Sequence, residues 1–350
     1  MIFEPHDYIP ISSEAQRNIA NLEQAYSAWL DTARSMHELP ASLYWAQKNG
    51  ADYLVAKLSA KDNGTAQGPR SVQTEQQHAQ YLHEKQRLQA RLAQQESILT
   101  ERVALYKTRL FRLPQMINLI GTILRQLDIE ELLGIDVMVV GTNAFSAYEL
   151  ACGVRFPTGN EATEDFDLTW CRETKAALTF NAGLRTRQHR KSLFAVLREI
   201  DPSYKINRSK PYQAINDKQY EVELLAAPSV HPLPKAEAFA PMYSLFEQES
   251  LLLGRPVSCV LATENGKACP LVVPDPRFMA LHKLWLSRKP ERKSSKKDKD
   301  QRQGYVLLDA VRHFLSSSHP LNVDFVLDLP EDLRLIFDAW CKERHFVPAS

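Results

Sequence analysis

The order of apolar and polar positions in the middle of the chain predicts a strand, a turn and a helix. Residues 137–140 form an apolar run that stops at Gly141, and residues 144–152 suit a helix. Further along, residues 166–170 (F-D-L-T-W) place apolar side chains at alternate positions, as a strand with one buried face does. This order of elements predicts an α/β core.

The N-terminal part has a different pattern. Apolar residues recur every three or four positions over 12–36, which predicts a helix. Residues 42–58 read as two strands around Asn49-Gly50, a strong hairpin signal. Residues 74–110 lack proline and glycine and predict a long helix with an apolar stripe. The stripe suits a coiled-coil arm, but it is short and Gln95 interrupts it, so packing within the chain is favoured.

The remaining pattern predicts more strands and then helices. Strands are expected at 204–206, 220–226, 257–262 and 271–273, and helices at 114–133, 192–200, 276–286, 305–316 and 331–342. The expected fold class is therefore α/β, of the α+β kind. The expected regions are an N-terminal helical region at 1–130, a core at 131–275 and a C-terminal helical region at 276–350.

Composition narrows the classes of function. The 350 residues include 43 Lys and Arg against 42 Asp and Glu, so nucleic acid would have to bind at a local basic patch. The five cysteines form no C-x-x-C pair, and no P-loop motif is present, which argues against a zinc site and a P-loop NTPase. The chain shows no signal-peptide pattern and no apolar stretch of membrane-spanning length. We therefore expect a cytoplasmic protein without a membrane partner.

Two acids stand out on the strand after the helix. Asp165 and Asp167 flank Phe166, so their side chains point to the same side of a strand. Two neighbouring carboxylates repel each other unless a cation lies between them. The spacing predicts a divalent-metal site that handles a nucleoside triphosphate, although a solvated strand face is the simpler alternative.

Further acids and a glycine turn extend this candidate site. Glu221 and Glu223 share one side of the next predicted strand, and either can supply a third carboxylate. Gly141 and Thr142 at a strand-to-helix turn suit phosphate binding through backbone N–H groups. An ordinary strand–helix connection also uses glycine at such a turn, so this signal is weak by itself.

Basic residues follow the predicted helix at 276–286. Lys283 is either a phosphate contact or a surface lysine. The run at 288–302 reads as a basic loop, which either binds a polyanion or is only solvated. A second basic cluster at 185–191 is a weaker candidate for such a contact.

The motifs together resemble a known family. The segments V-V-G-T-N-A-F-S-A-Y-E-L-A-C-G-V (139–154) and A-T-E-D-F-D-L (162–168) are similar to those of a bacterial nucleotidyltransferase-like family of the DNA polymerase β superfamily. The segments G-P-R-S (68–71) and V-P-D-P-R-F-M-A-L-H-K-L-W-L-S (273–287) add to the likeness. The resemblance implies a polymerase β-type core with a mixed sheet.

The resemblance also implies roles for particular residues. The third acid of the family pattern falls on Glu223, where the family commonly has Asp. Glu221 stays open as the alternative. The implied metal ligands and catalytic acids are Asp165, Asp167 and Glu223. The implied nucleotide contacts are Gly141, Thr142, Asn143 and Lys283. A K-x-x-D-x-x-Q-like segment adds possible substrate contacts at Lys296, Lys297, Asp300 and Gln303.

The implied function is metal-dependent transfer of a nucleoside monophosphate. The cofactor would be Mg²⁺ or Mn²⁺, the substrate an NTP, and the acceptor an RNA, a protein or a small molecule. The alternative is a non-catalytic binding or regulatory module with the same fold. Such a module would work with a partner protein, for instance in a toxin–antitoxin or defence pair.

Overall fold

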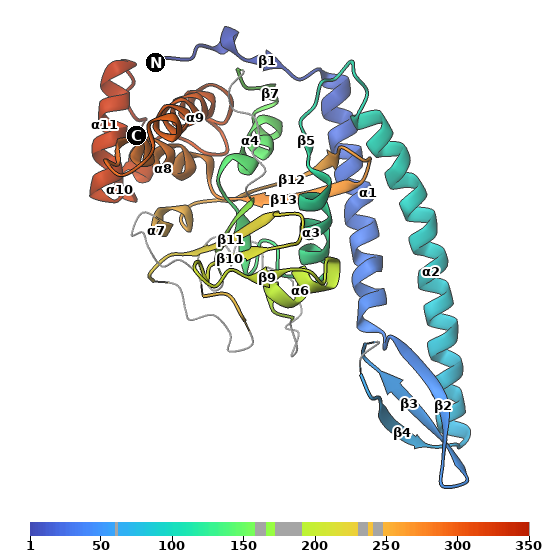
Figure 1. Ribbon diagram of the computed structural model, residues 1–350. Helices are drawn as coiled ribbons and strands as arrows, with labels where there is room; N and C mark the ends of the chain where they lie inside the picture. The colour runs from blue at the N-terminus through green and yellow to red at the C-terminus, as the bar shows by residue number, and fades with distance from the viewer. Residues whose placement is uncertain (60–61, 158–165, 172–190, 230–236, 241–247, 350) are drawn as a thin grey trace. The chain divides into compact units, whose positions relative to one another are not determined.

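The computed structural model describes residues 1–59, 62–157, 166–171, 191–229, 237–240 and 248–349 (Figure 1). The contacts among these residues divide the chain into two units. One unit contains residues 1–19 and 106–350, and the other contains residues 20–105. The second unit is therefore an insertion in the sequence of the first. None of the described helices is long and apolar enough to cross a lipid bilayer.

The inserted unit combines a three-stranded antiparallel sheet with two long helices. Its elements are α1 (Ser13–Glu38) from Ala20 onward, β2 (Ser42–Lys48), β3 (Ala51–Lys57), β4 (Thr65–Pro69) and α2 (Val72–Tyr106) as far as Leu105. The predicted hairpin at Asn49-Gly50 is present: both residues have positive φ, 53° and 78°, as a tight turn between twisted strands requires. Leu43, Leu54 and Tyr81 form the small core between sheet and helix.

Helix α2 packs within its own unit, as its interrupted stripe predicts. Gln95, the residue that breaks the stripe, donates from Nε2 to the Ala28 carbonyl of α1 at 2.9 Å. The predicted end of this helix is wrong, because α2 stops at Tyr106. The Tyr106 hydroxyl donates to the Pro114 carbonyl at 2.7 Å, so the chain turns back here and Leu110 is left 79% exposed.

The larger unit is built on a five-stranded mixed sheet. The strand order is β6-β8-β11-β10-β9, with β8 and β11 parallel and the other neighbours antiparallel. The strands are β6 (Val137–Val139), β8 (Phe166–Trp170), β11 (Glu221–Ala226), β10 (Gln213–Ile215) and β9 (Lys205–Ile206). The mixed sheet confirms the predicted α+β fold class.

Smaller sheets and helices complete this unit. A three-stranded sheet has the order β13-β12-β5, and β1 pairs with β7. These strands are β1 (Ile9–Pro10), β5 (Gln115–Met116), β7 (Val154–Arg155), β12 (Val257–Thr263) and β13 (Ala268–Val273). The shorter helices are α3 (Asn118–Ile129), α4 (Phe145–Cys152), α6 (Leu193–Ile200), α7 (Gln248–Leu251) and α10 (Val323–Leu327), with single 3-10 turns at η1 (Pro5–Asp7) and η2 (Thr142–Ala144).

Three longer helices form the C-terminal part: α8 (Pro276–Arg288), α9 (Ser294–Phe314) and α11 (Glu331–Glu343). Pro276 opens α8 as predicted, and Asp275 caps it by accepting from the Arg277 N–H at 2.9 Å. The prediction of a basic loop over 288–302 is wrong, because α9 already begins at Ser294. In this helix Asp300 and Gln303 take the buried positions that apolar residues usually occupy. The sequence therefore lacks the apolar periodicity that would predict a helix here.

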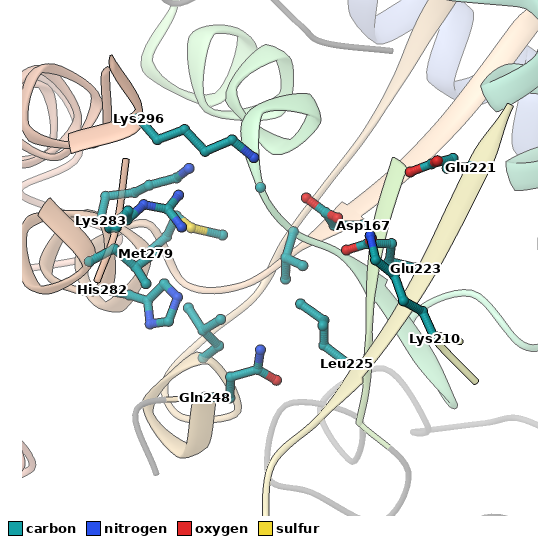
Figure 2. A pocket seen from close by; sticks show the side chains of 15 residues that line it. Asp167, Lys210, Glu221, Glu223, Leu225, Gln248, Met279, His282, Lys283 and Lys296 are labelled. Atoms are coloured by element: carbon teal, nitrogen blue, oxygen red, sulfur yellow. The ribbon is translucent and has the colours of Figure 1, made fainter. Parts of the chain in front are cut away.

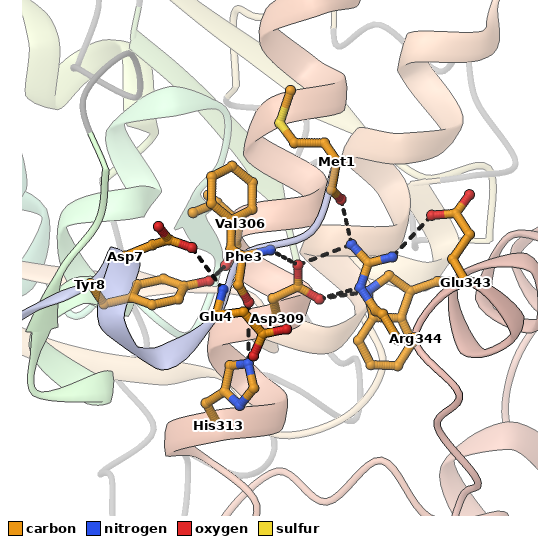
Figure 3. Close-up of polar contacts among 11 residues, drawn as sticks. Met1, Phe3, Glu4, Asp7, Tyr8, Val306, Asp309, His313, Glu343 and Arg344 are labelled. Atoms are coloured by element: carbon orange, nitrogen blue, oxygen red, sulfur yellow. Dashed lines mark hydrogen bonds and ion pairs between the residues drawn. The ribbon is translucent and has the colours of Figure 1, made fainter.

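The first residues of the chain are tied to α9 and α11 (Figure 3). The Phe3 N–H donates to Asp309 Oδ2 at 2.9 Å, and Trp340 Nε1 donates to Asp309 Oδ1 at 2.9 Å. Arg344 forms an ion pair with Asp309, and both side chains are only 1% exposed. Arg344 also donates to the Met1 carbonyl at 2.6 Å. We call these contacts the N-terminal clasp.

Candidate active site

The glycine turn after β6 lies directly against the described acid of β8. Gly141 has φ 71°, which favours glycine, and a Cβ placed there would lie 2.5 Å from Asp167 Oδ2. The Val140 N–H donates to the Asp167 carbonyl at 3.0 Å, so β6 and β8 hold the turn and the acid together. Glycine is needed at position 141 because the Asp167 carboxylate occupies the space of a side chain.

The second acid of the site lies beside Asp167 on the neighbouring strand. In the parallel pairing of β8 with β11, Glu223 is the direct partner of Asp167. Phe166, Val222 and Leu224 are fully buried on the opposite face, whereas both acids are half-buried. The alternation that the sequence predicts for both strands is confirmed, and it presents two carboxylates on one face. Asp165, the other predicted acid, lies outside the described residues, as does most of the basic cluster at 185–191.

A buried glutamine on β10 holds the acids of β11. Gln213 Nε2 donates to Glu221 Oε2 at 2.6 Å and to Glu223 Oε1 at 3.0 Å. Its carbonyl oxygen accepts from Asn207 Nδ2 at 2.6 Å. Because Gln213 is fully buried and its amide is held from both sides, it orients the carboxylates of Glu221 and Glu223.

Cationic side chains come from α8 and α9. Lys283 is 5% exposed, and its Nζ lies 2.9 Å from Asp300 Oδ1. Arg292 pairs with the other oxygen of the same carboxylate. Two cations share one anion here, so the cluster keeps a net positive charge. Lys296, one turn before Asp300 on α9, adds an exposed ammonium.

These groups enclose one cavity of about 380 Å³. It is lined by Val140, Gly141, Asp167, Lys210, Glu221, Glu223, Leu225, Gln248, Leu251, Met279, His282, Lys283, Leu286, Arg292 and Lys296. Figure 2 shows the acids on the strand side, with Lys283 and Lys296 across from them on the helix side. The cavity therefore has a mainly acidic wall, which also carries Lys210, and a basic wall. Such a pair suits a polyphosphate that carries a cation on one side and meets ammonium or guanidinium groups on the other.

The strand side and the helix side are also joined by a hydrogen bond between residues that do not line the cavity. The Tyr148 hydroxyl of α4 donates to the Pro274 carbonyl, just before α8, at 2.9 Å. Burial raises the pKa of Tyr148 far above its ordinary value, so the hydroxyl keeps its proton and this bond. The bond ties α4, which follows the glycine turn, to the start of the helix that carries Lys283.

Several predicted contact residues lie near the cavity without lining it. Asn143 is 1% exposed behind the turn, and Thr142 Oγ1 lies 3.5 Å from Gln303 Nε2. Asp300 is buried as the shared partner of Lys283 and Arg292. Lys297 Nζ points instead to the Pro290 carbonyl at 3.3 Å. Among the predicted substrate contacts of α9, Lys296 lines the cavity directly.

Sequence reasoning missed three cavity or support residues, Lys210, Gln213 and Gln248, and it included Arg292 only as one member of the basic run at 288–302. A usable signal existed for Gln213. The alternation over 212–215 followed by Asn216-Asp217 is typical of a strand and a turn that lead into β11. Asn216 Oδ1 accepts from the backbone of Lys218 and Tyr220 in that turn. No comparable pattern marks Gln248, which follows a stretch without clear periodicity.

Comparison with known proteins identifies the family of the chain. A family model described as a nucleotidyltransferase matches residues 118–323. The match covers more than half of the chain and includes every residue that lines the cavity. The chain belongs to this nucleotidyltransferase family. Neither a curated protein nor a solved structure gives a match.

Proposed function

We propose that this protein transfers a nucleoside monophosphate from an NTP to an acceptor hydroxyl, with a divalent metal ion as cofactor. The family membership supports nucleotidyl transfer in general. The observation that carries the proposal is the pairing of Asp167 with Glu223 on parallel strands, across one cavity from a basic wall. The resemblance of the turn and D-x-D motifs to a bacterial branch of the DNA polymerase β superfamily supports the same reaction.

The residues present fit a hard divalent cation. Carboxylate oxygens are the ligands that Mg²⁺ prefers, and Asp167 and Glu223 present them side by side on one sheet face. Within the described ranges, no group of three or more His, Cys, Asp or Glu side chains is placed to hold a metal. Asp165 would be the third ligand by its spacing from Asp167. A cation bound to these acids neutralises phosphate charge and lowers the pKa of an attacking hydroxyl.

The protein's own groups would position the reactants. Lys283, Arg292 and Lys296 hold phosphate oxygens at the basic wall, and Gln213 keeps Glu223 turned toward the cavity. The acceptor oxygen bonds to the α-phosphorus as the bond to the pyrophosphate oxygen breaks, and the hydroxyl proton passes to solvent. Position and electrostatics, rather than a covalent enzyme intermediate, lower the barrier.

The direct test supplies each NTP, labelled on the α-phosphate, with Mg²⁺ or Mn²⁺ and with total RNA, lysate protein or small-molecule extract. We expect label in one acceptor fraction and release of unlabelled pyrophosphate. NTP binding without transfer to any fraction would instead support the non-catalytic binding module. With NTP labelled on the γ-phosphate, nucleotidyl transfer should leave the acceptor unlabelled, whereas phosphoryl transfer would label it.

The two acids of β11 should contribute unequally. We expect Glu223→Gln to lower kcat by about 100-fold or more with little change in the KM for NTP, because Glu223 adjoins Asp167. Glu221→Gln should lower kcat less than about fivefold. Steady-state kinetics on the two variants compares the same chemical change at neighbouring positions. A larger loss in Glu221→Gln would show that Glu221 is the third acid.

Among the basic residues at 288–302, Lys296 should contribute to NTP binding through its charge. Lys296→Gln should raise the KM for NTP by about threefold to tenfold, because one ammonium facing the phosphates is lost. Lys297→Gln removes the same charge one residue away from the cavity lining and is the matched control. The Lys296 effect should shrink as salt rises. Equal effects of both variants would indicate a diffuse field rather than a contact.

A further inference from the structure

One polar side chain of the cavity belongs to neither charged wall. Gln248 lies at the start of α7 and is 2% exposed. Figure 2 shows its carboxamide on the Leu225 side of the cavity, apart from Asp167, Lys283 and Lys296. Its amide oxygen is buried, and no hydrogen-bond donor reaches it in the structure as described. A buried acceptor without a donor is unfavourable, so a ligand that donates to it gains binding energy there.

The surroundings of Gln248 suit a flat, largely apolar group. Leu225 and Leu251, the latter three residues after Gln248, line the cavity as well, and Val140, Met279 and Leu286 add apolar surface. Ligand sites commonly combine such a lining with a few placed polar groups that fix orientation. Phosphate oxygens accept hydrogen bonds and cannot donate to the Gln248 oxygen. The group that meets Gln248 must therefore carry an N–H or O–H.

We infer that Gln248 binds the Watson–Crick or Hoogsteen edge of the nucleobase, and so helps to set which NTP is used. This inference rests on the proposed function, because it places the triphosphate between the acidic and basic walls and the base at the Leu225–Leu251 end. A carboxamide offers one acceptor beside one donor, which matches a base edge that offers a donor beside an acceptor. The apolar side chains contact the faces of the base.

The experiment compares the binding of the four NTPs and of inorganic tripolyphosphate, which has no base, in the presence of Mg²⁺. Gln248→Leu should weaken the binding of the preferred NTP by about fivefold to tenfold and leave tripolyphosphate binding unchanged. Lys296→Gln should weaken both probes. Gln248→Glu presents two acceptors, so binding should shift toward GTP, whose N1–H and N2–H₂ are adjacent donors.

Each outcome decides between the two proposals. If the wild type binds neither NTP nor tripolyphosphate, the proposed function and this inference both fail. If the wild type binds NTP and the two Gln248 variants keep its affinity and base preference, the inference alone fails. If Gln248→Leu loses affinity for NTP and for tripolyphosphate in parallel, Gln248 has a structural role, and this result would also overturn the inference. Unfolding midpoints of both variants check that they fold.

Discussion

Asp167→Asn should lower kcat for nucleotidyl transfer by about 1,000-fold or more, a loss of about 4 kcal/mol in transition-state stabilisation. The change keeps the size of the side chain but removes a carboxylate that faces the cavity beside Glu223. Gly141 leaves space for this side chain, so asparagine fits without moving the turn. Transfer of α-labelled nucleotide, measured across a range of Mg²⁺ concentrations, gives the loss.

The control for this variant is Asp338→Asn, which makes the same change on the exposed side of α11, away from the cavity lining. Its kcat should equal that of the wild type. Asp165→Asn should resemble Asp167→Asn, and the double variant should be no worse than either, because the acids act as one unit. Full activity of Asp167→Asn at saturating Mg²⁺ would rule out the metal-binding role.

Asp309→Asn should destabilise the larger unit by about 3–5 kcal/mol. The substitution removes the negative charge from an ion pair whose side chains are each 1% exposed, and leaves the buried Arg344 guanidinium with only the half-exposed carboxylate of Glu343 as counter-charge. The same carboxylate accepts from Phe3 N–H and Trp340 Nε1, so the N-terminal clasp loosens as well. Chemical unfolding followed by tryptophan fluorescence, with Trp340 inside the clasp, measures the change.

Glu343→Gln is the matched control, because Glu343 pairs with the same arginine from a side chain that is 48% exposed. Exposed pairs contribute little, so the free energy of unfolding should fall by at most about 1 kcal/mol. The double variant Asp309→Leu with Arg344→Met should recover much of the loss, because it removes both buried charges. Equal effects of Asp309→Asn and Glu343→Gln would contradict the importance of the buried pair.

Most of the correct predictions came from the alternation of apolar and polar residues in strands and from residues typical of turns. Phe166 and Leu168 on β8, and Val222 and Leu224 on β11, are apolar at every second position, so the opposite face had to carry Asp167 and Glu223. Local patterns of this kind are readable because they depend only on neighbours along the chain. The pairing of Asp167 with Glu223 is not local, so alternation alone does not choose between Glu223 and Glu221, and only the family resemblance favours Glu223.

The loop predicted over the first half of α9 and the missed Gln213 have one physical cause in common. Asp300 in α9 and Asp309 in the clasp are charged residues in buried positions, and each is compensated by partners that are distant in sequence. The assumption that charged residues are exposed therefore predicts a loop where the first half of α9 lies. The same cause hid Gln213, whose burial depends on Asn207 and on the acids of β11. Long-range compensation of polar groups has no signature in a single sequence.

The N-terminal clasp has a consequence for the order in which the chain folds during its synthesis. Phe3 and Asp309 are 306 positions apart, and Met1 and Arg344 are 343 apart. Residues 1–3 can therefore dock only after the segment that carries Asp309 and Arg344 has left the ribosome. The unit of residues 20–105 is continuous in sequence and can complete its own contacts long before that point. We expect the nascent chain to carry a folded insertion before α11 has been synthesised and the larger unit can complete its contacts.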